Sequence, residues 1–414
     1  MVQRFNLVCG NAHLITVAET SFFIGNLLGV LVIGPVADWY GRKIGYLTFL
    51  TLWMVFSIAS HFAENVYVWM SFRFVVGASS IAFLTASTIY SVELTSGKWR
   101  SFTNHVCRTF VWNLGIALQA LFVYLIPNLQ SLELYYGLAA FPLMLLWYFM
   151  PESPRWLLSK GQNSRAVKIF KTACKFNGRK YETGLFPSLE KDEGKEQKSS
   201  FFDLFRTQSI RRNTMGLCTV WFVICFSYFG LMNHTPEYNW NVYLVFAFPA
   251  LILMPTALVQ PYLENTFGRK PMLTFPLLLA GLSLIVTQMM EQYHLELPVI
   301  IMSWIGVVFT DVSIANSYTF TRELYPTSIR TTALATASIM ARFGAIASPY
   351  VALLGQINSA LPLMVYGMAL LVAGLISLWI WPDTKNVELA HIETIEDCEA
   401  LASSPNSWTC QKKR

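Results

Sequence analysis

The chain has 414 residues, of which 54% are hydrophobic and 13% are charged. Soluble domains are about 45–50% apolar and about 25% charged, so this composition excludes an ordinary soluble protein. The net charge of +6 suits either nucleic acid or anionic lipid, and only the placement of the basic residues separates the two. The seven cysteines show no zinc or redox spacing, and their odd number argues against a disulfide framework. The composition therefore predicts a polytopic membrane protein.

Eleven apolar runs are long enough to cross a bilayer as helices, the only open-chain structure that satisfies every backbone amide in lipid. They are 14–36, 44–62, 66–90, 103–126, 132–150, 213–232, 241–262, 272–291, 298–321, 332–355 and 362–381. The prediction is an all-α membrane protein with two bundles of five and six spans. Its parts are an N-terminal bundle at 1–150, a cytoplasmic central loop at 151–212, a C-terminal bundle at 213–381 and a cytoplasmic tail at 382–414.

The loops between these spans alternate in charge. Those that contain Arg42, Arg269 and Arg330, with the central loop and the tail, hold most of the 30 basic residues. The loops on the other side contain no Lys or Arg; they are 61–65, 127–131, 233–240, 292–297 and 356–361. The positive-inside rule places the basic side in the cytoplasm, with the N-terminus outside and the C-terminus inside. The positive charge thus indicates orientation in a lipid bilayer, and no nucleic-acid partner is predicted.

Two loops in equivalent positions carry similar motifs. Gly34-Pro-Val-Ala-Asp38-Trp-Tyr-Gly41-Arg42-Lys43 follows the first span, and Pro261-Tyr-Leu-Glu-Asn265-Thr-Phe-Gly268-Arg269-Lys270 follows the seventh. Their spacing indicates an internal repeat. Glycine permits a tight turn, and a carboxylate such as Asp38 can cap a helix N-terminus. The alternative is that these charges only fix the topology of short loops.

These loops resemble the signature loop of the major facilitator superfamily. The resemblance implies a two-bundle helical transporter that works by alternating access, in which these loops act as conformational gates. The gating residues it implies are Gly34, Asp38, Gly41, Arg42, Lys43, Gly268, Arg269, Glu323 and Arg330.

Further motifs resemble the organic ion transporter family, the solute carrier 22 group, from about residue 5 to about residue 400. They are Phe5-Asn-Leu-Val-Cys9, Pro151-Glu-Ser-Pro-Arg155-Trp156, Glu323-Leu-Tyr-Pro326-Thr-Ser-Ile-Arg330 and Trp381-Pro-Asp-Thr-Lys385. That family has twelve spans and a large extracellular loop after the first. The resemblance therefore implies that this chain begins near the end of that loop and lacks the first span.

Arg342 is the strongest predicted substrate contact. It lies about eleven residues into its span, near the bilayer midplane, where a charged side chain is costly and is expected to have a function. The family resemblance implies an anionic or zwitterionic substrate, since organic anion carriers have Arg here and organic cation carriers have Asp. Asp311, which should lie at a similar depth, is a further candidate substrate contact. The competing interpretation is that Asp311 and Arg342 form a structural ion pair.

Other residues inside the predicted spans are weaker substrate contacts. Trp221, Phe222 and Tyr228 match a Trp-Phe…Tyr-x-Gly pattern whose aromatic side chains face the cavity in the family, although packing is an equal alternative. Arg73 is expected either to bind substrate or a coupling ion or to pack at the end of its helix, with packing favoured.

No motif for metal, nucleotide or nucleophilic chemistry is present, so we expect no enzyme activity and no cofactor. The predicted function is transport of small organic ions, most favourably anions or zwitterions, across the plasma membrane, with a counter-ion or coupled ion as a further partner. The alternatives are an organic cation or carnitine-type carrier and a truncated form that does not transport.

Overall fold

The computed structural model describes most of the chain as helices and short connections. The described residues are 2–11, 13–95, 108–126, 131–178, 201–234, 241–293, 296–325 and 329–381. By their contacts they fall into two units. Unit 1 holds Met1–Asn104 and Asn128–Lys198, and unit 2 holds His105–Pro127 and Ser199–Arg414. No strand occurs in the described ranges, as expected for an all-α membrane protein.

Nine helices of the described chain are long and apolar enough to cross a membrane. They are α2 (His13–Tyr40), α3 (Arg42–His61), α4 (Val66–Leu94), α12 (Gln208–His234), α13 (Val242–Phe267), α14 (Arg269–Glu291), α15 (Glu296–Leu324), α16 (Arg330–Ala352) and α17 (Ala360–Ile380). Each coincides with one of the eleven predicted spans, so nine of those predictions are confirmed.

The other two predicted spans have a different form. The run at 103–126 contains α6 (Arg108–Leu125), whose apolar part is short. The run at 132–150 is divided into α7 (Leu132–Ala139), α8 (Phe141–Met144) and α9 (Leu146–Phe149). Pro142 has no amide hydrogen to donate, and the amide of Ala140 bonds to Gly137 in a tighter turn at 3.2 Å. The count of eleven continuous spans is therefore not fully confirmed.

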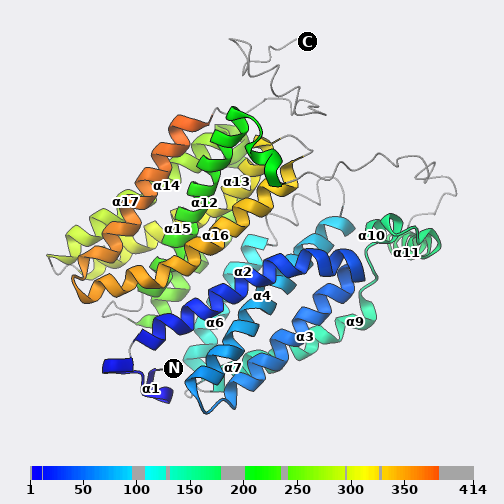
Figure 1. The fold of residues 1–414 in the computed structure, drawn as a ribbon, viewed down its shortest axis with the longest axis horizontal. Coiled ribbons are helices and arrows are strands. Elements are labelled where there is room, and N and C mark those ends of the chain that lie inside the picture. The colour runs from blue at the N-terminus through cyan, green and yellow to red at the C-terminus, as the bar shows by residue number, and fades with distance from the viewer. Residues whose placement is uncertain are drawn as a thin grey trace, which may run out of the picture. The chain divides into compact units, whose positions relative to one another are not determined.

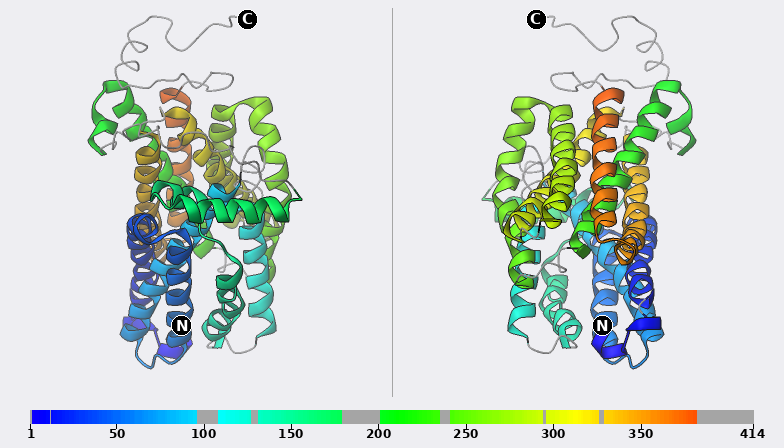
Figure 2. Two further views of the ribbon diagram at one scale, coloured as in Figure 1. Left: turned by 90° about the vertical axis from the view of Figure 1, so that its right-hand side faces the viewer. Right: turned by 90° about the vertical axis from the view of Figure 1, so that its left-hand side faces the viewer.

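The remaining described helices are short, and all but the last of them lie outside the spans. They are α1 (Val2–Phe5), η1 (Cys9–Asn11), α10 (Pro154–Ser159), α11 (Asn163–Phe176), η4 (Phe201–Phe205) and η6 (Leu353–Gln356). Of these, α11 packs on α10 and runs across the direction of α2, α3 and α4 within unit 1 (Figure 2). Its only buried residue is Ala166.

Glycines hold the helices of unit 1 at short range. Gly25 lies directly against the carbonyl of Phe74, and Gly77 lies directly against the carbonyl of Phe22, so α2 and α4 meet backbone to backbone. In lipid, no hydrophobic effect drives helices together. Helix association depends instead on van der Waals packing, which small residues allow at short range. A side chain at either position would separate the two helices.

Unit 2 packs α12 against α15, α16 and α17, and α14 against α15 and α17 (Figure 1). Its core is fully buried at Leu277, Leu284 and Tyr366. Gly344 of α16 lies directly against the carbonyl of Phe222 on α12. This contact has the same form as the α2–α4 contact in unit 1.

The contacts of α6 place it in unit 2, although the sequence assigns it to the bundle at 1–150. It packs along α13, and the rings of Tyr124 and Tyr243 meet edge to face with centroids 5.4 Å apart. The sequence did not predict this contact, because α13 lies more than a hundred residues after α6 in the chain. The predicted division into bundles otherwise stays a prediction.

Candidate functional site

The first motif loop forms a compact charge network between α2, α3 and α4. Gly41 joins α2 to α3 with φ of +110°, a conformation that favours glycine. Next to it, Arg42 Nη1 lies 2.6 Å from Asp38 Oδ1, and Arg42 Nε lies 3.1 Å from Glu93 Oε1. One guanidinium therefore ties the ends of three helices together. The motif predicted the turn and its arginine, but gave no sign of Glu93 as the partner.

Glu152 of the Pro-Glu-Ser-Pro-Arg run closes this loop from the other side. Its Oε1 accepts hydrogen bonds from the backbone amides of Arg42 and Lys43, each at 3.0 Å, and from the amide of Ser153 at 2.9 Å. Gly41 precedes α3 and has no side chain to cap it, so the carboxylate of Glu152 supplies that cap.

Trp156 adds a further bond from the same run, because its indole nitrogen donates to the carbonyl of Asp38 at 2.9 Å. The Gly-Arg-Lys loop and the Pro-Glu-Ser-Pro-Arg run, which lie more than 100 residues apart in the chain, therefore form one structure. Gly34 has a different setting, inside α2 immediately before Pro35. The residue before proline is sterically restricted, which favours glycine there.

The second motif loop repeats the first in unit 2. Gly268 has φ of +98°, and Arg269 Nε lies 3.0 Å from Glu323 Oε1. Arg330, at the start of α16, donates from Nε to the carbonyl of Tyr325 at 3.3 Å. The side chain of Asn265 lies outside the described residues. The structure thus brings the predicted gating residues of this half to one end of its helices.

A buried polar cluster that no sequence motif predicted lies next to this loop. Gln260 Nε2 donates to Glu264 Oε1 and to Asn316 Oδ1, each at 3.1 Å, and Asn316 donates to the carbonyl of Met272 at 2.6 Å. All three polar side chains of the cluster are buried. The signal available in the sequence was the four-residue spacing of Gln260 and Glu264 in an otherwise apolar helix.

Arg342 lies in the middle of α16 and is half-buried. The exposed Ala335 lies seven residues, or two helical turns, before it on the same side of α16. Its Nε is buried without a hydrogen-bond partner, and among the described residues the guanidinium forms no hydrogen bond or ion pair. The ion pair with Asp311 that we weighed from the sequence is therefore not formed.

Asp311 is buried in α15 in a different environment. Its carboxylate lies close enough to the hydroxyl of Tyr228 on α12 to act on it electrostatically. Tyr228 is itself buried and meets the ring of Phe229 edge to face at 5.4 Å. Asp311 and Tyr228 thus lie together in unit 2.

The other two aromatic residues of α12 are packed within unit 2. The indole nitrogen of Trp221 donates to Thr321 Oγ1 at 3.1 Å, and its ring meets that of Tyr318 with centroids 4.5 Å apart. Phe222 stacks on Phe226 with centroids 5.8 Å apart. For Trp221, these contacts fit the alternative that its side chain packs in the helix bundle.

Arg73 has several contacts within unit 1. Its Nη1 lies 3.8 Å from Glu133 Oε1, and its guanidinium lies over the rings of Phe22 at 5.0 Å and Trp69 at 5.4 Å. Trp69 donates to the same carboxylate at 3.1 Å. An arginine held in this way fits the packing role that we favoured from the sequence, and its substrate role stays a prediction.

Among the residues that the structure describes, no group of three His, Cys, Asp or Glu side chains is placed to hold a metal ion.

Comparison with known proteins places the fold. The "Sugar (and other) transporter" family matches residues 9–395. The inward open structure of the xylose transporter XylE from E. coli superposes with a TM-score of 0.72, at 19% identity, over 93% of this chain and 89% of that chain. XylE as a proton:xylose symporter bound to 6-bromo-6-deoxy-D-glucose gives a TM-score of 0.69 at 16% identity, over 92% and 88%. The fold is that of a major facilitator superfamily transporter.

Sequence relatives narrow the family. The beta-alanine transporter of Drosophila melanogaster is 31% identical over 98% of this chain and 67% of the relative. Human solute carrier family 22 member 13 is 32% identical over 98% and 72%. Organic anion transporter 3 of Oryctolagus cuniculus is 31% identical over 100% and 76%. The chain belongs to the solute carrier 22 group of the major facilitator superfamily, and it is a multi-pass membrane transporter and not an enzyme.

Proposed function

We propose that this protein carries small organic anions or zwitterions across the membrane by alternating access, and that Arg342 provides the cationic contact for the substrate. The observation that carries the proposal is a guanidinium in the middle of a span without a hydrogen-bond or ion-pair partner among the described residues.

An unpaired arginine at this depth requires a compensating group. Exposure of the charge to hydrocarbon costs several kcal/mol (about 2.5–3.5 by insertion scales), so the face of α16 that bears Arg342 must border water or a ligand. A guanidinium binds carboxylate or sulfate through two parallel hydrogen bonds, which a cation cannot accept. Arg342 therefore favours a substrate that carries at least one negative charge.

The relatives support this substrate class without limiting it to one charge. One relative is named an organic anion transporter and another a beta-alanine transporter, and β-alanine is a zwitterion at neutral pH. The organic cation transporter protein of Drosophila melanogaster, at 29% identity, is a relative as well. For this chain, the unpaired Arg342 favours a substrate with a negative charge.

The two motif loops are proposed as the conformational gates of this cycle. Arg42–Glu93 in unit 1 and Arg269–Glu323 in unit 2 are equivalent ion pairs at the ends of their helices. In the proposed cycle, these pairs hold one state and break in the next. The side chain of Asp38 is 66% exposed while it bonds to Arg42, so it is the accessible end of the first network.

The alternating loop charges support a plasma-membrane orientation with the N-terminus outside and the C-terminus in the cytoplasm. A coupled ion or counter-ion completes the proposal, as expected for a secondary carrier.

Uptake by cells that express the full chain tests the substrate assignment. The probes are labelled benzoate as an anion, β-alanine as a zwitterion and tetraethylammonium as a cation. Benzoate or β-alanine uptake by the wild type is expected to saturate. Arg342→Gln is expected to raise KM about tenfold or more, and Arg342→Lys is expected to give an intermediate value because it keeps the charge and loses the bidentate geometry.

Arg165→Gln serves as the matched control, because this arginine is exposed on α11 and bonds only to the neighbouring Gln162 among the described residues. Surface labelling confirms equal amounts of each variant. Transport of tetraethylammonium alone, or an unchanged KM in Arg342→Gln, would contradict the proposal.

A further inference from the structure

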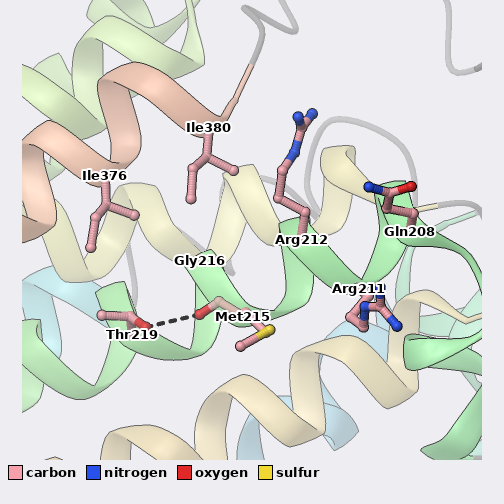
Figure 3. A pocket seen from close by; sticks show the side chains of 8 residues that line it. All are labelled: Gln208, Arg211, Arg212, Met215, Gly216, Thr219, Ile376 and Ile380. Atoms are coloured by element: carbon pink, nitrogen blue, oxygen red, sulfur yellow. Dashed lines mark hydrogen bonds between the residues drawn. The ribbon is translucent and has the colours of Figure 1, made fainter.

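A surface pocket of about 380 Å³ lies in unit 2, where the beginning of α12 meets the end of α17 (Figure 3). It is lined by Gln208, Arg211, Arg212, Met215, Gly216, Thr219, Ile376 and Ile380. The residues from α12 recur at spacings of three and four, so most of them share one helix face. The proposed transport mechanism does not use this pocket.

The floor of the pocket is apolar. Ile376 and Ile380 extend from α17 toward Gly216, and Met215 is 62% exposed at its edge (Figure 3). A Cβ at Gly216 would meet Ile380 Cδ1 at 3.0 Å, so the glycine keeps the groove between the two helices open. A groove of this kind accepts a hydrocarbon chain.

The rim of the pocket is basic. Arg211 and Arg212 are exposed, and within the described residues neither side chain forms a hydrogen bond or an ion pair. Arg212 leaves α12 on the side of Ile380, whereas Arg211 leaves it in a different direction (Figure 3). Arg42 and Arg269, the arginines of the two motif loops, are instead neutralised by carboxylates.

The residues next to the pocket indicate that it lies at the level of the lipid headgroups. The turn η4 immediately before α12 exposes Phe201 and Phe202, the latter by 79%. The carbonyl of the buried Leu204 in this turn accepts a hydrogen bond from Thr214 Oγ1 at 3.2 Å, which fixes the turn to α12. Exposed aromatic rings beside basic residues are typical of a membrane–water interface.

The lipid side of α17 is exposed as well. Trp379, next to the pocket residue Ile380, is 85% exposed. The basic rim therefore adjoins both the aromatic turn and a hydrocarbon-facing helix surface.

We propose that this pocket binds one anionic phospholipid of the cytoplasmic leaflet. The headgroup phosphate accepts hydrogen bonds from Arg212, the second negative group of a headgroup such as phosphoserine lies toward Arg211, and the first part of an acyl chain lies on Met215, Ile376 and Ile380. The assignment combines charge complementarity at the rim with an apolar floor, which a soluble anion would leave uncovered. It is independent of the substrate proposal.

Native mass spectrometry of the full chain in detergent, titrated with phosphatidylserine, tests the proposal. The wild type is expected to bind one phosphatidylserine more tightly than phosphatidylcholine. Arg212→Gln is expected to weaken phosphatidylserine binding about fivefold, the effect of one basic residue at an anionic surface. Thr219→Trp, which fills the pocket from an exposed position, is expected to remove the bound lipid while leaving both arginines in place.

Arg206→Gln is the matched control, since this exposed arginine lies a few residues before the pocket and does not line it. It is expected to bind phosphatidylserine as the wild type does. Thermal unfolding in phosphatidylcholine shows that each variant is folded. The proposal is overturned by unchanged binding in Arg212→Gln, by an equal loss in Arg206→Gln, or by glycerophosphoserine competing as well as the intact lipid.

Discussion

Arg42 and Glu93 form an ion pair with Nε and Oε1 3.1 Å apart, and the pair joins the start of α3 to the end of α4. The same relationship recurs in unit 2 between Arg269 and Glu323, at 3.0 Å, at the start of α14 and the end of α15. In each unit the arginine directly follows a glycine with positive φ. The internal repeat is therefore structural as well as sequential, and it includes the carboxylate partners.

The first prediction concerns the coupling within this pair. The side chains of Arg42 and Glu93 are 16% and 15% exposed, so solvent screens them little. In a double-mutant cycle with Arg42→Gln and Glu93→Gln, we expect a coupling free energy of about 1–2 kcal/mol. The measurement is thermal unfolding in detergent, and the Arg269–Glu323 cycle is expected to agree. Purely additive effects would contradict a structural role for the pair.

The second prediction compares two glycines. Gly41 has φ of +110°, and a Cβ there would collide with the Glu152 carboxylate, so Gly41→Ala is expected to destabilise the protein by about 1–2 kcal/mol or more. Gly115, in the interior of α6, has open space where a Cβ would lie. Gly115→Ala is expected to be neutral or to stabilise by up to about 1 kcal/mol. Equal effects of the two substitutions on thermal unfolding would show that the turn geometry is unimportant.

The third prediction concerns the cap of α3. Glu152 Oε1 accepts three backbone amides, and Glu152→Ala leaves two of them at an uncapped helix start. We expect a loss of about 1–2 kcal/mol in the free energy of unfolding. Glu64→Ala, which removes an exposed acid between α3 and α4, is the control and is expected to change stability by less than about 0.5 kcal/mol. An equal change in the free energy of unfolding for both variants would show that the Glu152 cap does not stabilise α3.

The fourth prediction concerns the buried polar cluster of α13 and α15. Asn316 bonds both to Gln260 and to the carbonyl of Met272, so Asn316→Ala leaves buried partners unsatisfied and is expected to cost about 2–3 kcal/mol. Ser283 is also buried, but its hydroxyl bonds to the carbonyl of Ala280 in its own helix. Ser283→Ala is expected to cost less than about 1 kcal/mol in the same unfolding measurement. A similar loss in both variants would mean that the cluster adds no stability across helices.

Local sequence was sufficient for much of the fold. Nine continuous spans were predictable because burial in lipid demands an apolar run of helical length, and two turns were predictable because a Gly-Arg-Lys sequence follows each of two equivalent spans. The break at Pro142 was not predicted, since the apolar run continues through it. Proline acts on backbone hydrogen bonds and leaves hydrophobicity unchanged.

The candidate site, like the fold, was predictable from the sequence only in part. Arg342 was identifiable from the sequence because a charged residue inside a span is rare. Its lack of an ion-pair partner was not predictable, because Asp311 is expected at a similar depth in the membrane. Glu152 as the cap of α3, Glu93 as the partner of Arg42, and Asn316 as the partner of Gln260 all lie more than 50 residues away from the groups that they bind.

The sequence by itself thus determined the class of protein, nine of its membrane spans, its repeat and its family, because these depend on composition and on spacing along one helix or loop. Only the tertiary structure decided which charges are paired, which aromatic residues are packed, and where a pocket with a basic rim forms. Those outcomes depend on the rotation of each helix about its axis and on contacts at a few ångströms, which hydrophobic runs do not encode.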